Sequence, residues 1–183
     1  MSRQKFPISE VAQNEINRFR QEIAGMDAGT VDENDFKKFR LNNGIYGIRF
    51  KSDEHMIRIK LPFGYVTADQ LDQIADVAEE MTPNKLLHVT TRQAIQLHNI
   101  KRSDIPDLLT KIHEAGLTSR EACGNTVRNI TCDELAGIHK NEIFDVNPYM
   151  ELMFRYLLRN PIGQNLPRKF KIAFEGCPDS DRA

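Results

Sequence analysis

The segment HVTTRQAIQLHNI, residues 88–100, carries many long hydrogen-bonding side chains for a stretch that alternates like a strand. Arg92 and Gln96 lie where two expected strands connect, and Gln96 and His98 fall on one face because side chains alternate along a strand. Arginine stays protonated and donates in a planar fork, so such side chains suit a carboxylate-rich ligand or an oxyanion. The pattern therefore predicts an anion-binding surface.

Further basic and amide side chains lie on three segments: Arg58 and Lys60 in MIRIK, Asn125, Arg128 and Asn129 in ACGNTVRNITC, and Lys169 and Lys171 in RKFKIAF. A few charge-assisted hydrogen bonds, each worth roughly 1.5–3 kcal/mol, would hold an anion firmly in a partly dry site. For a single pair such as Arg58 and Lys60, a solvated strand face is the simpler interpretation. Spacing alone does not bring these segments together.

The apolar spacing predicts the elements that position these residues. We expect a helix over 8–29 capped by Ser9, a polar linker over 30–40, strands over 44–50 and 55–61, a helix over 67–81 with a Thr67–Gln70 capping box, strands over 85–91 and 94–100, and a helix over 103–116 capped by Ser103. Residues 44–116 then run β-β-α-β-β-α, a compact α+β unit.

Past residue 116, the sequence predicts a loop over 122–132 that leads into a strand. A helix follows over 147–160, with Asn147 as its cap and Pro148 at its first position. A final strand is expected over 168–174.

Composition narrows the class of protein. The chain has 183 residues, 40% hydrophobic and 28% charged, which is typical of a soluble globular protein. A net charge of −1 argues against a nucleic-acid surface over the whole molecule, although a local basic pocket remains compatible with it. No stretch is long and apolar enough to span a membrane, and the N-terminus lacks the apolar core of a secretion signal, so we expect a cytoplasmic protein. Three irregularly spaced cysteines argue against a disulfide framework.

Five motifs occur in a fixed order: LPFGYVTADQL, HVTTRQAIQLHNI, ACGNTVRNITCDELAG, FDVNPY and LPRKFKIAF. Together they resemble the first part of the siroheme-dependent nitrite and sulfite reductases, from about residue 40 to the end of the chain. The resemblance implies an α+β fold. It would comprise an N-terminal helix and linker over 1–43, a ferredoxin-like half-domain over 44–116, and the start of a siroheme and iron–sulfur reductase domain over 117–183.

The resemblance also implies roles for the polar side chains. Siroheme is an iron tetrapyrrole ringed with carboxylates, and the family reduces sulfite to sulfide or nitrite to ammonia with six electrons at its iron. The residues implied to hold siroheme are His88, Thr90, Thr91, Arg92, Gln96 and Asn129. Those implied to bind the anion, stabilise charge on its oxygens and supply protons are Arg58, Arg128, Lys169 and Lys171. His88 departs from the pattern, because some relatives carry arginine there.

Family members couple siroheme to a [4Fe–4S] cluster held by four cysteines in closely spaced motifs. Cys123, Cys132 and Cys177 do not form such motifs, and in relatives the cluster motifs lie downstream of LPRKFK. We therefore expect no metal ligands in this chain. We also expect that it is the N-terminal part of a longer reductase and is inactive alone.

The expected partners are sulfite or nitrite and an electron donor, such as ferredoxin or a reductase subunit, with neither nucleic acid nor membrane. In the family, the half-domain pairs with a second copy from later in the chain. Without that copy, we expect an exposed sheet edge, exposed apolar surface and self-association.

Two other functions remain open. A stand-alone siroheme-binding module for storage, delivery or sensing would explain the missing cysteines, but Lys169 and Lys171 would have little purpose in it. An RNA-binding ferredoxin-like domain fits by topology only, because such modules expose stacking aromatic side chains on their strands and few lie on these strands.

Overall fold

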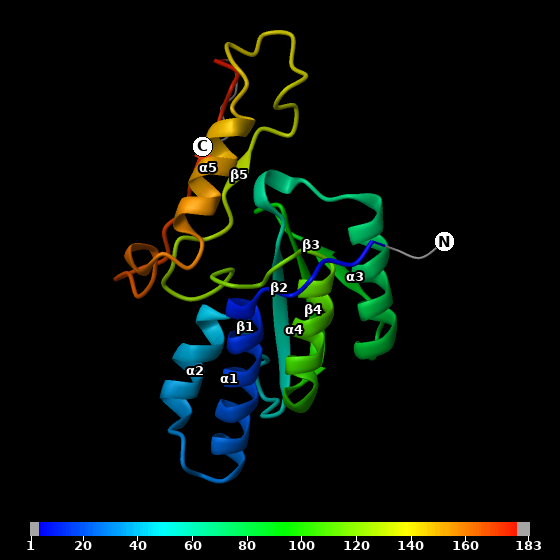
Figure 1. Ribbon diagram of the computed structural model, residues 1–183, viewed down its shortest axis with the longest axis vertical. Helices are drawn as coiled ribbons and strands as arrows, with labels where there is room; N and C mark the ends of the chain where they lie inside the picture. Colours follow the sequence, from blue (N-terminus) through cyan, green and yellow to red (C-terminus); the bar gives the residue numbers. More distant parts are fainter. Residues whose placement is uncertain (1–3, 179–183) are drawn as a thin grey trace.

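A computed structural model describes residues 4–178 of the chain (Figure 1). The helices are α1 Glu10–Asp27, α2 Glu33–Asn42, α3 Ala68–Met81, α4 Ile105–Glu114 and α5 Asn147–Leu157, with short 3-10 helices at Pro62–Gly64, Arg102–Asp104 and Pro161–Gly163. The strands are β1 Ile45–Gly47, β2 Glu54–Lys60, β3 Leu87–Val89, β4 Ala94–Lys101, β5 Thr131–Cys132 and β6 Ala173–Phe174. The predicted β-β-α-β-β-α order is confirmed for β1 through α4.

Strands β1 to β4 form one antiparallel sheet in the order β1-β2-β4-β3. Alternation along β2 sends Ile57 and Ile59 into the core and leaves Arg58 on the opposite face. Apolar side chains of α1, α3 and α4 fill the core side, including Phe19, Ile74 and Leu108. One sheet face is thus covered by helices, and the other is left to polar side chains.

The predicted cap of α1 is confirmed, because the Ser9 side chain accepts a hydrogen bond from the Ala12 amide. The Thr67–Gln70 capping box of α3 is also present. At α4 the predicted Ser103 cap is wrong. Ser103 donates to the Asp104 carboxylate inside a 3-10 turn, and the helix begins only after that turn.

The linker predicted over 30–40 is wrong, since α2 forms there. Asp32 caps the helix by accepting from the amides of Asn34 and Asp35. Phe36 is buried in the core, with its ring centroid 6.2 Å from that of Phe19. Burial of one aromatic residue stabilises a helix whose other positions are mostly polar.

The second part of the chain, residues 117–178, contains few strand pairs. β5 and β6 are parallel and only two residues long, and an isolated bridge pairs Val127 with Phe170. The strand predicted over 168–174 is therefore confined to its last residues, because its partner β5 is equally short. The predicted Asn147 cap of α5 is wrong, because Asn147 is the first residue of the helix. Its main-chain amide donates to the Asp145 carboxylate.

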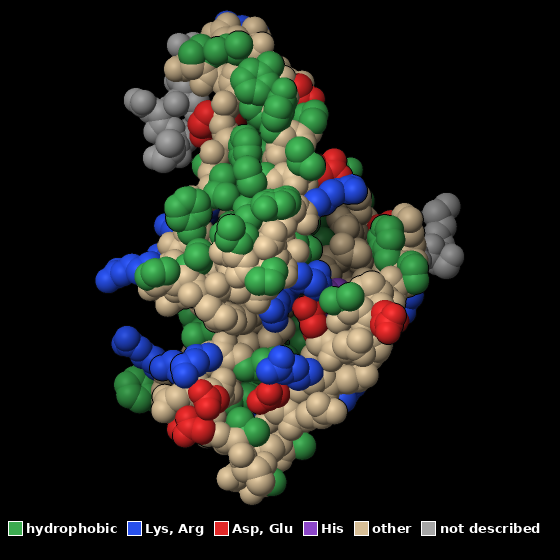
Figure 2. All heavy atoms as spheres, turned by 60° about the vertical axis from the view of Figure 1, so that its left-hand side comes forward, with side chains coloured by type: hydrophobic (Ala, Val, Ile, Leu, Met, Phe, Trp, Pro, Cys, Tyr) green, Lys and Arg blue, Asp and Glu red, His purple; other side chains and the backbone are tan. Residues whose placement is uncertain are grey.

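Large apolar side chains are exposed over this second part, as Figure 2 shows for the region around α5. They are Leu135, Ile138, Ile143, Phe144, Tyr149, Leu152, Met153, Tyr156, Ile162 and Phe170. The predicted exposed apolar surface is confirmed, and self-association stays a prediction. Among residues 4–178, no helix is long and apolar enough to cross a membrane.

Candidate anion-binding site

Arg58 and Gln96 lie opposite each other on β2 and β4, on the sheet face turned away from the core. With its amide oxygen turned toward Arg58, Gln96 accepts from Nε at 3.0 Å and from Nη2 at 2.5 Å. The guanidinium also lies over the Tyr46 ring, 5.7 Å from its centroid. Gln96 therefore orients Arg58 on this face, and anion binding there stays a prediction. Lys60 is buried, so the solvated face suggested for Arg58 and Lys60 does not hold for the lysine.

Arg128 meets Arg58 at the loop that follows α4. Arg128 donates from Nη1 to the carbonyl of Ala122 at 2.9 Å, and Arg58 Nη1 reaches the same oxygen at 3.5 Å. Arg128 also donates from Nε to the Gly124 carbonyl and from Nη2 to the Tyr46 hydroxyl. Two guanidinium groups from distant segments thus converge on one carbonyl.

Arg92 is fastened to the second part of the chain. Its Nη2 donates to the carbonyls of Asn129 at 2.9 Å and Ile172 at 3.0 Å. Asn129 is buried, and its Nδ2 donates to the carbonyls of Leu61, Arg92 and Gln93. Asn129 therefore supports the turn that carries Arg92.

Gln93 is a residue that the sequence analysis did not select. Its amide makes two hydrogen bonds with the Cys132 main chain: Nε2 donates to the carbonyl at 2.7 Å, and Oε1 accepts from the amide at 3.1 Å. This imitates one rung of a sheet and ties the β3–β4 turn to β5. No sequence pattern marks this role, because the partner main chain lies 39 residues away.

Lys169 and Lys171 flank Phe170, whose main chain pairs with the segment of Arg128. The Arg128 amide donates to the Phe170 carbonyl at 2.9 Å, and the Phe170 amide donates to the Thr126 carbonyl at 3.0 Å. Both lysine side chains are exposed. The structure thus brings the two lysines into the same region as Arg92 and Arg128.

The threonines and histidines lie at the sheet edge. The Thr90 hydroxyl accepts from the Arg92 amide within the tight turn, and Thr91 is exposed. The rings of His88 and His98 are 4.6 Å apart between centroids. The pKa of His98 is lowered mainly by burial and further by the neighbouring His88 and Arg58, which keeps that imidazole neutral at physiological pH.

The basic side chains of the site are not neutralised by carboxylate side chains of the described residues. Among the described residues, no ion pair joins a carboxylate to Arg58, Arg92, Arg128, Lys169 or Lys171. Burial and then the neighbouring Arg128 lower the pKa of Arg92, so the arginines repel one another. Arg92 Nε is also buried and has no hydrogen-bond partner within residues 4–178. A polyanionic group with several carboxylates fits this set of donors.

The thiols do not fit an iron–sulfur cluster. Nowhere in residues 4–178 do three or more His, Cys, Asp or Glu side chains gather in a metal-binding arrangement, and three cysteines cannot supply four thiolates. Burial raises the pKa of Cys123 to about 12 and that of Cys132 to about 11, so both stay protonated.

Two family models match the chain. One, described as the nitrite/sulfite reductase ferredoxin-like half domain, matches residues 48–115. The other, described as the nitrite and sulphite reductase 4Fe-4S domain, matches residues 123–183.

Similar curated proteins are named as nitrite reductases. A ferredoxin–nitrite reductase of Leptolyngbya laminosa is 33% identical over 165 residues, which are 87% of this chain and 32% of that protein. An assimilatory ferredoxin-dependent nitrite reductase of Haloferax mediterranei is 31% identical over 180 residues, 92% of this chain and 30% of that protein. The chain thus spans about a third of the length of these relatives.

Solved structures share the fold. The NirA protein of Mycobacterium tuberculosis superposes with a TM-score of 0.75 at 23% identity, over 93% of this chain and 36% of that one. A dissimilatory sulfite reductase I superposes with a TM-score of 0.58 at 16% identity, over 98% of this chain and 52% of that one.

Proposed function

Because the chain belongs to the nitrite and sulfite reductase family, we propose that it supplies the anion- and siroheme-binding residues of the N-terminal part of a six-electron reductase. The observation that carries the proposal is the convergence of Arg58 and Arg128 on the Ala122 carbonyl, beside a face without paired carboxylates. Nitrite and sulfite are small oxyanions, and two guanidinium forks suit their oxygens.

In this proposal, two groups of residues have different roles. Arg58 and Arg128 bind the oxyanion and stabilise negative charge that develops on its oxygens. Lys169 and Lys171, exposed beside Arg128, are the proton donors. Gln96 holds the Arg58 guanidinium in place, which spares it part of the entropy of ordering on binding.

Siroheme would lie against Arg92 and its neighbours. Arg92 is anchored through Nη2, and its remaining donors would bind siroheme carboxylates. Thr90, Thr91, His88 and the NH2 group of Gln96 complete the set, and Asn129 holds the turn. Siroheme, when bound, supplies the iron at which the anion is reduced. The [4Fe–4S] cluster that the family also uses would take its thiolates from outside this chain.

The substrate and donor follow from the relatives. Curated relatives from Leptolyngbya laminosa, Haloferax mediterranei and Zea mays are named as ferredoxin-linked nitrite reductases, which favours nitrite as substrate and ferredoxin as donor. Sulfite is the alternative substrate, because the same basic residues suit both anions. We further propose that the chain functions as part of a longer polypeptide and that, alone, it binds without turning over substrate.

The first test is binding by the 183-residue chain. Siroheme should bind with a defined stoichiometry in an absorbance titration, and nitrite or sulfite should then shift the absorbance bands. An immunoblot of the source cells should detect a protein larger than the 21.0 kDa chain. Siroheme binding without an anion response, together with a band at 21.0 kDa, would instead identify a tetrapyrrole carrier.

A further inference from the structure

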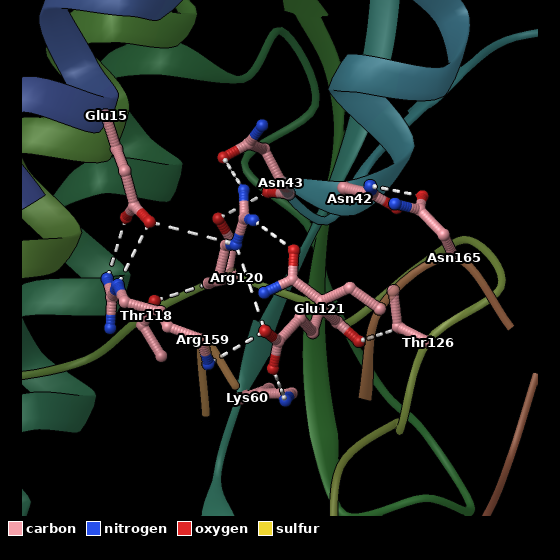
Figure 3. A network of polar contacts seen from close by, with 12 residues as sticks. Glu15, Asn42, Asn43, Lys60, Thr118, Arg120, Glu121, Thr126, Arg159 and Asn165 are labelled. Carbon is pink, nitrogen blue, oxygen red and sulfur yellow. Dashed lines mark hydrogen bonds and ion pairs between the residues drawn. The ribbon is translucent and has the colours of Figure 1, made fainter. Parts of the chain in front are cut away.

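A second group of charged residues lies away from the anion-binding site, where α1, the end of β2 and the segments after α4 and α5 meet (Figure 3). Two carboxylates and three basic side chains take part. Glu15 accepts from Arg159 Nε at 3.0 Å and Nη2 at 2.7 Å, and its Oε1 lies 3.7 Å from Arg120 Nε. Glu121 accepts from the Arg159 amide at 2.8 Å. Its other oxygen lies 3.5 Å from Lys60 Nζ.

This network has one positive charge more than negative charges. Within residues 4–178, the ion-pair partners of Lys60, Arg120 and Arg159 are Glu15 and Glu121. The side chains of Lys60 and Glu121 are 3% and 1% exposed, so bulk water solvates these charges little. Buried cations normally acquire a partner of opposite charge or give up their proton.

Lys60 is incompletely partnered. An ammonium has three N–H donors, and its one recorded partner within residues 4–178 is the Glu121 carboxylate at 3.5 Å, longer than a strong charge-assisted bond. The Phe154 ring lies beyond it, with 5.8 Å from Nζ to the centroid. Burial is the main cause that lowers the pKa of Lys60, to about 8.

A cavity of about 260 Å³ opens beside this ammonium. Its polar lining includes Lys60 and Arg159, whose Nη1 has no hydrogen bond among the described residues. Its apolar lining includes Phe6, Ile8, Leu117, Phe154 and Leu158. A cationic end and apolar walls are complementary to a molecule with one carboxylate and a small apolar body.

We propose that this cavity binds a small monocarboxylate, with the carboxylate on Lys60 and Arg159 and the apolar body against Phe154 and Leu158. The ligand would supply the missing negative charge and the missing acceptors at once. The proposal is independent of the reductase function, because none of these residues lies in the anion-binding site described above.

Calorimetric titration of the 183-residue chain with benzoate and with benzyl alcohol, its uncharged analogue, tests the proposal. Benzoate should bind about tenfold or more tightly than the alcohol, since charge-assisted hydrogen bonds are lost with the alcohol. Lys60→Met should remove this preference, and Lys140→Met, at an exposed lysine, should keep it. Equal affinities of the two compounds, or an unchanged preference in Lys60→Met, would overturn the proposal.

If Lys60→Met does not fold, the natural chain still decides the matter. Reductive methylation followed by mass spectrometry measures how fast each lysine amine reacts. Saturating benzoate should slow methylation of Lys60 severalfold and leave that of Lys140 unchanged. Equal rates at Lys60 with and without benzoate would show that the carboxylate lies elsewhere.

Discussion

Arg92 and Asn129 are joined by reciprocal hydrogen bonds: Arg92 Nη2 donates to the Asn129 carbonyl at 2.9 Å, and Asn129 Nδ2 donates to the Arg92 carbonyl at 3.0 Å. The pair links the β3–β4 turn to the segment before β5, which are 37 residues apart. Arg92 therefore has two tasks in the proposed function, as an anchor between the two parts and as a siroheme ligand.

Arg92→Ala should lower siroheme occupancy and also loosen this connection. We expect the free energy of unfolding to fall by about 1–3 kcal/mol, because two partly buried carbonyls lose a charged donor. Absorbance per polypeptide measures occupancy, and urea unfolding measures stability. Arg49→Ala, at an exposed arginine, is the control. Undiminished siroheme binding in folded Arg92→Ala would remove this residue from the cofactor site.

Arg128→Met should weaken nitrite or sulfite binding about tenfold to a hundredfold while siroheme content stays near that of the natural chain. The reason is that Arg128 and Arg58 share the Ala122 carbonyl and present their remaining donors together. Anion titration of the siroheme-loaded chain measures the effect, and Arg155→Met on α5 is the matched control. If this variant and Arg92→Ala lost siroheme equally, the two roles would have been assigned wrongly.

Gln93→Leu should destabilise the contact between the two parts of the chain. The substitution keeps an apolar stem but removes both polar groups, which leaves the Cys132 amide and carbonyl without the Gln93 partner. We expect a loss of about 1–3 kcal/mol in the free energy of unfolding. In the control Gln73→Leu, the side-chain hydrogen bonds that are lost are exposed, so the free energy of unfolding should change by less than about 0.5 kcal/mol. Equal effects of the two substitutions would contradict a bridging role.

Sequence periodicity predicted the sheet and its helices well, because each has a clear apolar face. Ile57 and Ile59 alternate with Arg58, and the Thr67–Gln70 capping box marks the start of α3. The α2 helix was missed because only one of its side chains, Phe36, is buried, so the segment looks like a polar linker. Its signal was the Asp32 cap.

The site was predictable in its residue types and not in its connections. Charge and spacing selected Arg58, Arg92 and Arg128, but hydrogen bonds to main-chain carbonyls leave no sequence pattern. The Ala122 carbonyl that joins two of these arginines is invisible in a sequence, as is the pairing of Gln93 with the Cys132 main chain. Such contacts depend on loops brought together by tertiary packing.

The apolar face of α5 should drive self-association of the isolated chain. Leu152 and Tyr156 lie one helical turn apart and are 70% and 62% exposed. Light scattering at rising concentration should give a mass approaching twice 21.0 kDa. A Leu152→Glu/Tyr156→Glu double variant should remain at the monomer mass, since charge opposes burial of this face. A monomeric mass of the natural chain at high concentration would refute the prediction.

His55 should make the fold sensitive to acid. Burial is the main cause that lowers the pKa of His55 to about 4, and the nearby Arg40 adds to it. Its side chain is 4% exposed, and its Nδ1 has no hydrogen-bond partner in the described structure. Because the unfolded chain takes up this proton near pH 6.5, the unfolded state binds more protons between pH 6.5 and 4.

The stabilisation from neutral His55 is therefore complete above pH 6.5 and is lost as the pH falls toward 4, by about 3 kcal/mol at most. Carboxylates also titrate at the acid end of this range. The loss of unfolding free energy is therefore compared between the natural chain and a variant without His55. Urea unfolding at pH 7, 6 and 5 should show a smaller loss for His55→Leu than for the natural chain. His139→Leu, at a less buried histidine, should lose as much as the natural chain. Parallel pH dependence in His55→Leu and the natural chain would mean that the pKa of His55 is the same in the folded and the unfolded chain, which its burial beside Arg40 opposes.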